Sequence, residues 1–491
     1  MNKKLIIIMS LFLALTFSLS SFALEIPGYE GGIKNEMIYQ EVIFITGEPI
    51  LLTGTIDIRK TERSNRVTER YTYKLANPQH EAELSRTVSI DNDMTINGGQ
   101  KQEVLSLNSY KETIEVKGQK FEVDNNNIQW SKSNIQDTKP GVIYFAGNWD
   151  ARKNYTINKD EGNVIVETKG TVVGYDQYWG ETETQTLQHF IQYNKEGETP
   201  LRWQGTATVE AVHNRTKDYT YEANAPSQIS FRGGYLLTEQ QENILKYSYD
   251  LPRFTDDGTL KSQRNTGVKS LSLDTNPLNK RLNIPQMKDI GGHWAEGNIL
   301  LMASLEAVYP NSNYFGPSLP MSRGDFARAV AMVMGIVPEE ETPQRTRSIQ
   351  TQKEEDKIFL DVSSQDPNQK YIKEVKDKGI MVGPGEGKFL PNQTLTKAEA
   401  TAIIVRLLGF ENMAPLQNYN TGFRDDANIP KWAKSSIYVA KELSLVGGTT
   451  DGYFQATKPM TKAEAVTMLT NLIRYLQKEL RYDYRERIIN Y

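Results

Sequence analysis

The sequence predicts a multidomain protein in which an all-β N-terminal region is followed by an all-α C-terminal region. Three observations lead to this prediction. Between residues 25 and 250 polar and apolar residues alternate with a period of two, which is typical of half-buried strands. From Met287 onward the apolar period becomes helical. The length of 491 residues is enough for roughly two to four domains.

The N-terminus has the layout of a secretory signal. Lys3 and Lys4 precede an apolar run from Leu5 to Leu15, and a small-x-small cleavage site ends at Ala23. We therefore expect residues 1–23 to be a signal peptide and the mature chain to begin at Leu24. The apolar run is short for a membrane span, and we expect no span after cleavage. The predicted product is secreted.

Composition narrows the possible partners and cofactors. The formal charge is −4, and removal of two lysines with the signal takes it to −6 (−4 − 2), which argues against nucleic acid as a partner. The chain has no cysteine, so disulfides and thiolate metal sites are ruled out. Its four histidines show no metal-ligand spacing. We expect no metal and no cofactor.

Residues 24–250 are predicted to form a β-rich domain, either a sandwich or a barrel. The segment KETIEVKGQKFEVD, residues 111–124, reads as a hairpin with a turn around Gly118-Gln119 and with Ile114 and Val116 on one face. EPILLTGTIDI (48–58) resembles TPLRWQGTATV (199–209), so two related subdomains are possible. Residues 251–285 are polar and punctuated by glycine and proline, and we expect a linker there.

The C-terminal part contains one helical unit three times. We place the repeats at 286–337, 357–412 and 421–477, with a flexible polar insertion at 338–356 and a tail at 478–491. The apolar stripe stops after Leu476, which predicts a solvated end. Each unit begins with an aspartate and then an aromatic residue on a first helix; these are Asp289 and Trp294, Asp361 and Tyr371, and Asp425 and Trp432.

The second helix of each unit follows a Thr/Ser-basic-x-acid box. The outer residues fit a capping box, in which the hydroxyl accepts from the amide three residues on and the acid reaches back. They are Ser322 with Asp325, Thr396 with Glu399, and Thr461 with Glu464. Loss of such a cap costs on the order of 1 kcal/mol.

The basic residue inside each box is not explained by capping. Arg323, Lys397 and Lys462 stand at the positive end of a helix, where a cation is mildly unfavourable. A basic side chain beside free helix amides would, however, make an anion site. The alternative is a solvated surface charge.

The order of motifs resembles that of the S-layer homology (SLH) domain. FLDV, HWA, GIMVG, FLPN and the three boxes follow one another as in that family, over roughly Met287 to Tyr475. The resemblance implies a three-pronged spindle that binds an acidic secondary cell-wall polysaccharide, often one carrying pyruvate ketals. Two boxes depart from the family by having lysine for arginine. The first copy also lacks a clear G-I-x-x-G.

The resemblance implies which residues bind the polymer, with packing or surface charge as the alternative for the aromatic and basic ones. They are Arg323, Lys397, Lys462, Trp294, Tyr371, Trp432, Asp289, Asp361, Asp425, Gly383 and Gly447. It also implies a protein attached non-covalently to the cell wall that displays its β-rich part outward. Other copies of the chain in a surface layer are a further candidate partner.

An alternative function is a wall-anchored hydrolase of carbohydrates with its catalytic site in the β-rich region. Paired acids such as Asp91 and Asp93, or Glu181 and Glu183, are the residue type that glycoside hydrolysis needs. Such pairs are more often solvated acids on strands or turns, and no local catalytic motif is present. We therefore expect a protein that is not an enzyme.

Overall fold

A computed structural model describes residues 31–63, 66–197, 200–222, 233–255, 258–309, 313–338, 359–416 and 418–484. The predicted signal peptide, residues 339–356 of the predicted insertion and residues 485–491 of the predicted tail lie outside the described residues. Among the helices that are described, none has the length and apolar character needed to cross a membrane.

The N-terminal region is all-β, as predicted, and its described strands form one antiparallel sheet of 15 strands. The strands are β1 (Gly32–Lys34), β2 (Tyr39–Ile43), β3 (Ile50–Arg63), β4 (Arg66–Asn77), β5 (Ala82–Asn97), β6 (Gln100–Val116), β7 (Gln119–Asp124), β8 (Ile128–Thr138), β9 (Ile143–Ile157), β10 (Gly162–Gln177), β11 (Gly180–Lys195), β12 (Leu201–Glu222), β13 (Gly234–Phe254), β14 (Leu260–Ser272) and β15 (Leu278–Leu282). Each is hydrogen-bonded to its neighbour along the chain, except that β7 and β8 both bridge β6 and β9, and β15 pairs with β13.

The hairpin predicted at 111–124 is confirmed. Strands β6 and β7 are joined by Lys117 and Gly118, both with positive φ (49° and 78°), which is the two-residue turn that matches strand twist. The turn lies one residue before the predicted position. Ile114 and Val116 point into the core, where 2% and 5% of their surface is exposed.

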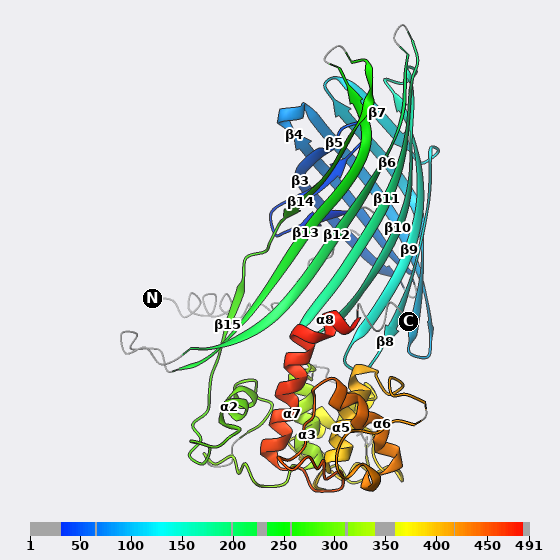
Figure 1. The fold of residues 1–491 in the computed structure, drawn as a ribbon. Helices are drawn as coiled ribbons and strands as arrows, with labels where there is room; N and C mark the ends of the chain where they lie inside the picture. The colour runs from blue at the N-terminus through cyan, green and yellow to red at the C-terminus, as the bar shows by residue number, and fades with distance from the viewer. Residues whose placement is uncertain are drawn as a thin grey trace, which may run out of the picture.

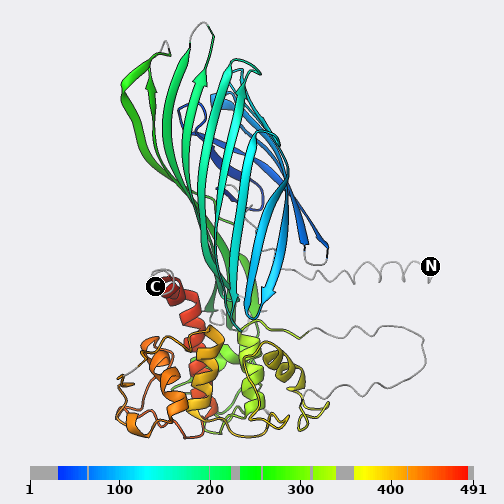
Figure 2. The ribbon, with the colours of Figure 1, turned by 90° about the vertical axis from the view of Figure 1, so that its right-hand side faces the viewer.

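The sheet is long and curled around an apolar interior (Figures 1 and 2). Strand β1 contacts β12 and β13, and the turn after β1 reaches the β14–β15 connection, where Asn35 Nδ2 donates to the Asp274 carbonyl at 3.4 Å. The two segments that resemble each other lie in β3 and β12 of this one sheet. They are therefore not separate subdomains, and a single continuous sheet accounts for the region.

The predicted linker at 251–285 is wrong. This segment contains the end of β13 and the whole of β14 and β15. Strand β14 is paired on one side only, with β13, and most of its side chains are exposed. An edge strand of this kind needs no apolar alternation, so its polar sequence resembles a linker.

The helical region contains α2 (Glu296–Ser304), α3 (Arg323–Val333), α4 (Gln369–Asp377), α5 (Lys397–Leu408), α6 (Lys431–Glu442) and α7 (Lys462–Arg474). Two short 3-10 helices are also described: η1 (Pro78–His80) lies between β4 and β5, and η2 (Asp426–Asn428) precedes α6. Helix α3 packs against α4, α5 against α6, and α7 against α2. Each pair therefore combines the second helix of one repeat with the first helix of the next, and the third repeat closes onto the first.

A ring of backbone hydrogen bonds joins the three repeats ahead of their second helices. The Met321 amide donates to Met460 at 2.8 Å, the Met460 amide to Leu395 at 2.8 Å, and the Leu395 amide to Met321 at 2.9 Å. Because these bonds run between repeats, no single repeat can form its own helix start in the observed way.

The C-terminus is not a solvated tail in its described part. Helix α7 continues through a π turn, η3 (Tyr475–Glu479), into α8 (Leu480–Asp483). Leu476, Leu480 and Tyr484 are buried, and the Tyr484 ring stacks on Tyr144 of the sheet with centroids 5.8 Å apart. The prediction failed because these apolar residues are separated by polar and charged ones and join the core that the sheet and the helices share.

The base of the sheet and the helices share one apolar core. Trp179 is fully buried at this junction and its Nε1 donates to the Val333 carbonyl at 2.8 Å. Gln177 Nε2 donates to the Leu476 carbonyl at 3.0 Å. The sheet therefore stands directly on the helical region (Figure 1).

Candidate binding grooves

The predicted helix caps are confirmed for the second and third repeats. In the second, Thr396 Oγ1 accepts from the Glu399 amide at 3.3 Å and Glu399 Oε2 accepts from the Thr396 amide at 2.8 Å. The third repeat has the same box. In the first, Ser322 accepts from the Asp325 amide, but the shorter Asp325 carboxylate accepts instead from Asn368 Nδ2 at 3.1 Å.

The free helix amides expected beside the basic residues are not present. The first helical amides, those of Arg323, Lys397 and Lys462, donate to the carbonyls of Gln393, Lys458 and Leu319 at 2.9, 3.2 and 2.8 Å. The next amide of each helix also donates to a loop of another repeat, and the third donates to the capping hydroxyl. The prediction of an anion site made of these amides is therefore wrong, because the amides already donate to carbonyls of other repeats and to the capping hydroxyls.

The three aspartates that begin the repeats hold a loop in place. Each carboxylate accepts from two successive backbone amides at 2.7–2.8 Å: Asp289 from Phe315 and Gly316, Asp361 from Phe389 and Leu390, and Asp425 from Phe454 and Gln455. Burial would raise the pKa of Asp289 and of Asp361, but these amides lower it below its usual value. Polymer contact by these aspartates stays a prediction.

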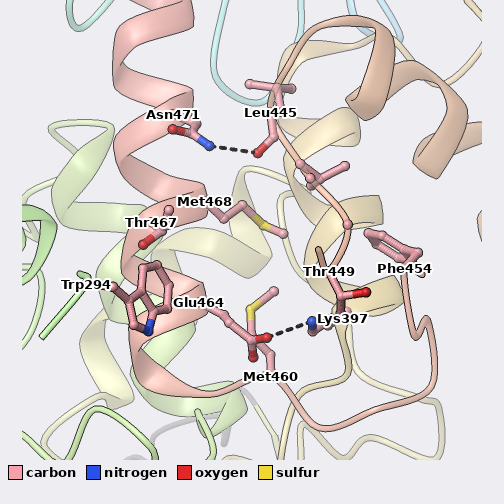
Figure 3. A pocket seen from close by; sticks show the side chains of 13 residues that line it. Trp294, Lys397, Leu445, Thr449, Phe454, Met460, Glu464, Thr467, Met468 and Asn471 are labelled. Atoms are coloured by element: carbon pink, nitrogen blue, oxygen red, sulfur yellow. Dashed lines mark hydrogen bonds and ion pairs between the residues drawn. The ribbon is translucent and has the colours of Figure 1, made fainter. Parts of the chain in front are cut away.

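One groove lies along α7, between Trp294, which precedes α2, and the segment that follows α6; we call it groove A and define it by Trp294, Lys397, Gly447 and Thr467. Its volume is about 280 Å³. These residues come from all three repeats, because Trp294 belongs to the first, Lys397 to the second and the others to the third. Figure 3 shows the Trp294 ring beside Thr467 and the Lys397 ammonium on the opposite side. The Trp294 side chain is 66% exposed.

Lys397 is not a lone cation in groove A. Its Nζ lies 2.6 Å from Glu464 Oε1 (Figure 3). Burial would raise the pKa of Glu464, but the bonds from Lys397 and Thr461 lower it below its usual value. An ammonium group has three donors, so a carboxylate could bind Lys397 beside Glu464.

A second groove lies between α5 and α6; groove B is defined by Trp432, Arg323, Val382 and Ala402. Its volume is about 120 Å³, and Trp432 is 59% exposed. Arg323 Nε donates to the Phe389 carbonyl and Nη2 to the Val382 carbonyl, both at 3.0 Å, while Nη1 lies 3.7 Å from Glu399. Groove B therefore has the same arrangement as groove A, but its tryptophan comes from the third repeat, its basic residue from the first and its other two residues from the second.

Tyr371 does not correspond to the two tryptophans. Each first helix is followed by a residue with positive φ, which is Glu306, Gly379 or Ser444. Twelve positions before it stand Trp294, Pro367 and Trp432. Tyr371 lies on the next turn of its helix and is only 7% exposed, so it is not a second-repeat version of these exposed rings. The prediction failed because Tyr371 is the aromatic residue nearest to the start of the first helix in the second repeat.

At the corresponding place between α3 and α4, which we call groove C, two large side chains stand where grooves A and B have smaller ones. Groove C is defined by Pro367, Lys462, Tyr309 and Arg328. Tyr309 stands where groove B has Val382 and groove A has Gly447; Arg328 stands where they have Ala402 and Thr467. The Arg328 guanidinium lies 3.3 Å above the Tyr309 ring, and its Nη2 donates to the Glu306 carbonyl at 3.2 Å. Lys462 Nζ is 3.5 Å from the Phe315 carbonyl.

The two predicted glycines have different roles. A Cβ at Gly383 would lie 1.8 Å from the Lys388 carbonyl oxygen, so this position requires glycine. Its counterpart in the third repeat is Gly448, where a Cβ would lie 3.1 Å from the Tyr453 oxygen. A Cβ at Gly447 would meet nothing within 4 Å. Gly447 therefore borders open space in groove A rather than supporting a turn.

Of the paired acids of the β region, Asp91, Asp93 and Glu181 lie next to arginines, whereas Glu183 accepts from Gln185 Nε2 at 2.6 Å. Arg66 Nε is 2.7 Å from Asp93 and Arg66 Nη1 is 3.8 Å from Asp91. Glu181 is 3.2 Å from Arg215 Nε. Within the described residues, no group of three or more histidine, cysteine or acidic side chains is placed to hold a metal ion.

The model of the S-layer homology domain matches residues 286–327, 358–401 and 422–466. The chain carries three S-layer homology domains. Each match begins within one residue of a repeat deduced from the sequence and ends 10–11 residues before that repeat does, and grooves A and B lie between these SLH domains.

Several curated proteins are similar over part of the chain. A surface layer protein of Brevibacillus choshinensis is 34% identical over 107 residues, which are 22% of this chain and 10% of that protein. An endoglucanase of Bacillus sp. (strain KSM-635) is 30% identical over 23% of this chain and 12% of its own. A cellulosome-anchoring protein of Acetivibrio thermocellus is 35% identical over 19% and 21%.

The chain thus spans between 10% and 21% of the length of these relatives. The three SLH domains and the relatives that share them indicate a location at the cell surface or in the cell wall.

Proposed function

We propose that this protein is attached non-covalently to the cell wall by its SLH domains, which bind an acidic, pyruvate-bearing secondary cell-wall polysaccharide, and that it displays the β-rich sheet outward. One observation supports this most: grooves A and B each combine an exposed tryptophan, a basic side chain and an open loop position taken from three different repeats. An aromatic face with a few convergent polar groups suits a sugar ring.

The basic residue would recognise the acid on the polymer. In groove A, Lys397 would act as a point charge beside Glu464, whereas in groove B the guanidinium of Arg323 would add directional donors. The three helix pairs would form the prongs of a spindle with pseudo-threefold symmetry. Two grooves on one polymer gain by effective concentration, so each needs only modest affinity.

The stoichiometry of binding tests this proposal. The probe is the repeating unit of polysaccharide released from protein-free sacculi, titrated calorimetrically into the full chain. We expect two units per chain, because groove C is filled by Tyr309 and Arg328. Lys397→Ala should remove one unit, and Trp432→Ala, which spares the buried bonds of Arg323, should remove the other.

Lys462→Ala is the matched control, since it makes the same change in the filled groove, and it should leave two units bound. Three units in the wild type, or equal effects of Lys397→Ala and Lys462→Ala, would contradict the proposal.

We propose that the β-rich sheet binds or assembles rather than catalyses, since each acid pair has a member beside an arginine, Asp93 beside Arg66 and Glu181 beside Arg215. An activity screen of the full chain on wall and plant glycans tests this. Turnover abolished by a single Asp or Glu substitution in the sheet would establish the hydrolase alternative instead.

A further inference from the structure

A second cavity lies next to groove A, where the sheet meets α7. Its volume is about 410 Å³. It is lined from the sheet by Asp218 and Tyr219 of β12, and from the helical side mainly by Ser444, Arg474 and Lys478. We call it the junction cavity. It is formed by the β-rich part and the third repeat together, so an SLH domain alone would not contain it.

The junction cavity continues groove A along one face of the last helix. Glu464, Thr467 and Asn471 line groove A, and Asn471, Arg474 and Lys478 line the junction cavity. These positions are three or four residues apart, so their side chains lie on one helix face. From Glu464 to Lys478 the helix axis rises about 21 Å.

Asn471 lies at the boundary between the two cavities. Its Nδ2 donates to the Leu445 carbonyl at 3.4 Å, across the upper end of groove A in Figure 3. A bond of this length is weak and both groups are polar, so a sugar chain passing over them can replace it with hydroxyl contacts. Beyond Asn471 the helix makes its π turn, a feature that is frequent at functional sites.

The lining of the junction cavity suits a carbohydrate. Arg474 and Lys478 are exposed cations, while Ser444 and Tyr219 offer hydroxyl groups. The pKa of Tyr219 is raised, mainly by burial, so its hydroxyl stays protonated and able to donate. Arg474 and Lys478 lie on the helix face that carries Glu464, the partner of Lys397 in groove A. Asp218 and Glu479 also line the cavity, so its sugar contacts would combine cations, carboxylates and hydroxyl groups.

We propose that the junction cavity is a further sugar subsite, in which the strand held in groove A continues onto the foot of the sheet. This inference rests on the proposed function and adds a contribution from β12 to polymer binding. Groove B differs here, because Arg406 stands at the position of Asn471 and pairs with Glu411 at 3.1 Å. The longer binding path therefore belongs to groove A.

Two probes of different length test the proposal on the full chain. The first is the single repeating unit of polysaccharide released from protein-free sacculi, and the second is a long fraction of the same material. The variant is Arg474→Ala/Lys478→Ala, which changes two exposed side chains. Arg481→Ala is the control, since Arg481 is an exposed cation on the adjoining helix outside the cavity.

The double variant should bind the long fraction at least about tenfold more weakly, because one of several linked contacts is lost. It should bind the single unit as the wild type does, and Arg481→Ala should change neither. Unchanged affinity for the long fraction, or an equal loss for both probes, would overturn the subsite. Wild-type protein that binds neither probe would overturn the proposed function itself, and the subsite with it.

Discussion

At the scale of residues, three positions separate the open grooves from the filled one. Groove A has Trp294, Gly447 and Thr467 where groove C has Pro367, Tyr309 and Arg328. The basic residue of the box is present in all three repeats and so does not distinguish them. Space beside the cation, rather than the cation alone, is expected to decide whether a sugar can bind.

A tyrosine at position 447 should therefore close groove A as Tyr309 closes groove C. Since a Cβ at Gly447 meets nothing within 4 Å, Gly447→Tyr should leave the melting temperature unchanged while removing one bound repeating unit. Gly447→Ala, which adds a single carbon, should keep both units. Calorimetric titration of the three proteins distinguishes these results; two units bound by Gly447→Tyr would show that the groove is not the site.

The capping boxes predict a local loss of stability. Thr461→Ala removes the hydroxyl that accepts from the Glu464 amide, so the free energy of unfolding should fall by about 1 kcal/mol in urea denaturation. Thr394→Ala, at an exposed position outside the cap, should have little effect. Equal effects of the two changes would argue against a role of the box in stability.

Asp426 predicts a loss of stability in acid. Burial alone would raise its pKa, but bonds from Lys434 and Thr421 lower it to about 2 from an ordinary 3.8. A depressed pKa stabilises the fold above pH 4 and loses that effect as the pH falls towards 2. The melting temperature should therefore decline over this interval, and less steeply in Asp426→Asn. An identical slope in both proteins would contradict this assignment.

The capping residues could be predicted from sequence because a cap involves only neighbours in the chain. Thr396 and Glu399 are three residues apart, and nothing outside the helix start is needed to place them. The tryptophan positions could not be aligned in the same way. Tyr371 is the nearest aromatic residue to the start of its helix, but the loops before the first helices differ in length, so only the backbone reveals that Pro367 is the matching position.

At the scale of elements, the stripe on each second helix was predictable but its partner was not. The pattern of apolar residues gives the same stripe whether α5 packs on the first helix of its own repeat or on α6 of the next one. Packing between repeats also explains why the amides at the helix starts are occupied, since the carbonyls that accept from them belong to loops of other repeats.

The C-terminal helix makes a prediction about the junction. Leu480, the first residue of α8, is fully buried in the core that the sheet and the helices share, so Leu480→Ala should lower the free energy of unfolding by about 2–5 kcal/mol. Arg481→Ala, at the neighbouring exposed position, should be nearly neutral. Urea denaturation of both variants measures the difference. A neutral Leu480→Ala would mean that the helix end does not support the sheet.

Strand β14 shows the limit of period-based reasoning for elements. A strand buried on one face reveals itself by alternation, as β6 does at Ile114 and Val116. An edge strand that is exposed along most of its length carries no such signal. A polar composition therefore indicates that a segment is exposed, but it does not distinguish an exposed strand from a linker.

At the scale of the whole molecule, the sheet and the helices are parts of one packed body. Trp179 and Tyr144 of the sheet lie in the same core as α3, α5 and α7. The sequence could not predict this junction, because its contacts join residues more than a hundred positions apart. A fragment starting near Pro285 would expose this core, so binding is best measured on the full chain.

The most direct test of wall attachment is sedimentation of the full chain with protein-free sacculi, before and after removal of the secondary polysaccharide. Lys397→Ala/Trp432→Ala is compared with wild type and with Lys462→Ala. We expect wild type and Lys462→Ala to sediment only when the polysaccharide is present, and the double variant to remain in solution. Sedimentation of wild type on stripped sacculi, or of the folded double variant on intact ones, would contradict attachment through grooves A and B.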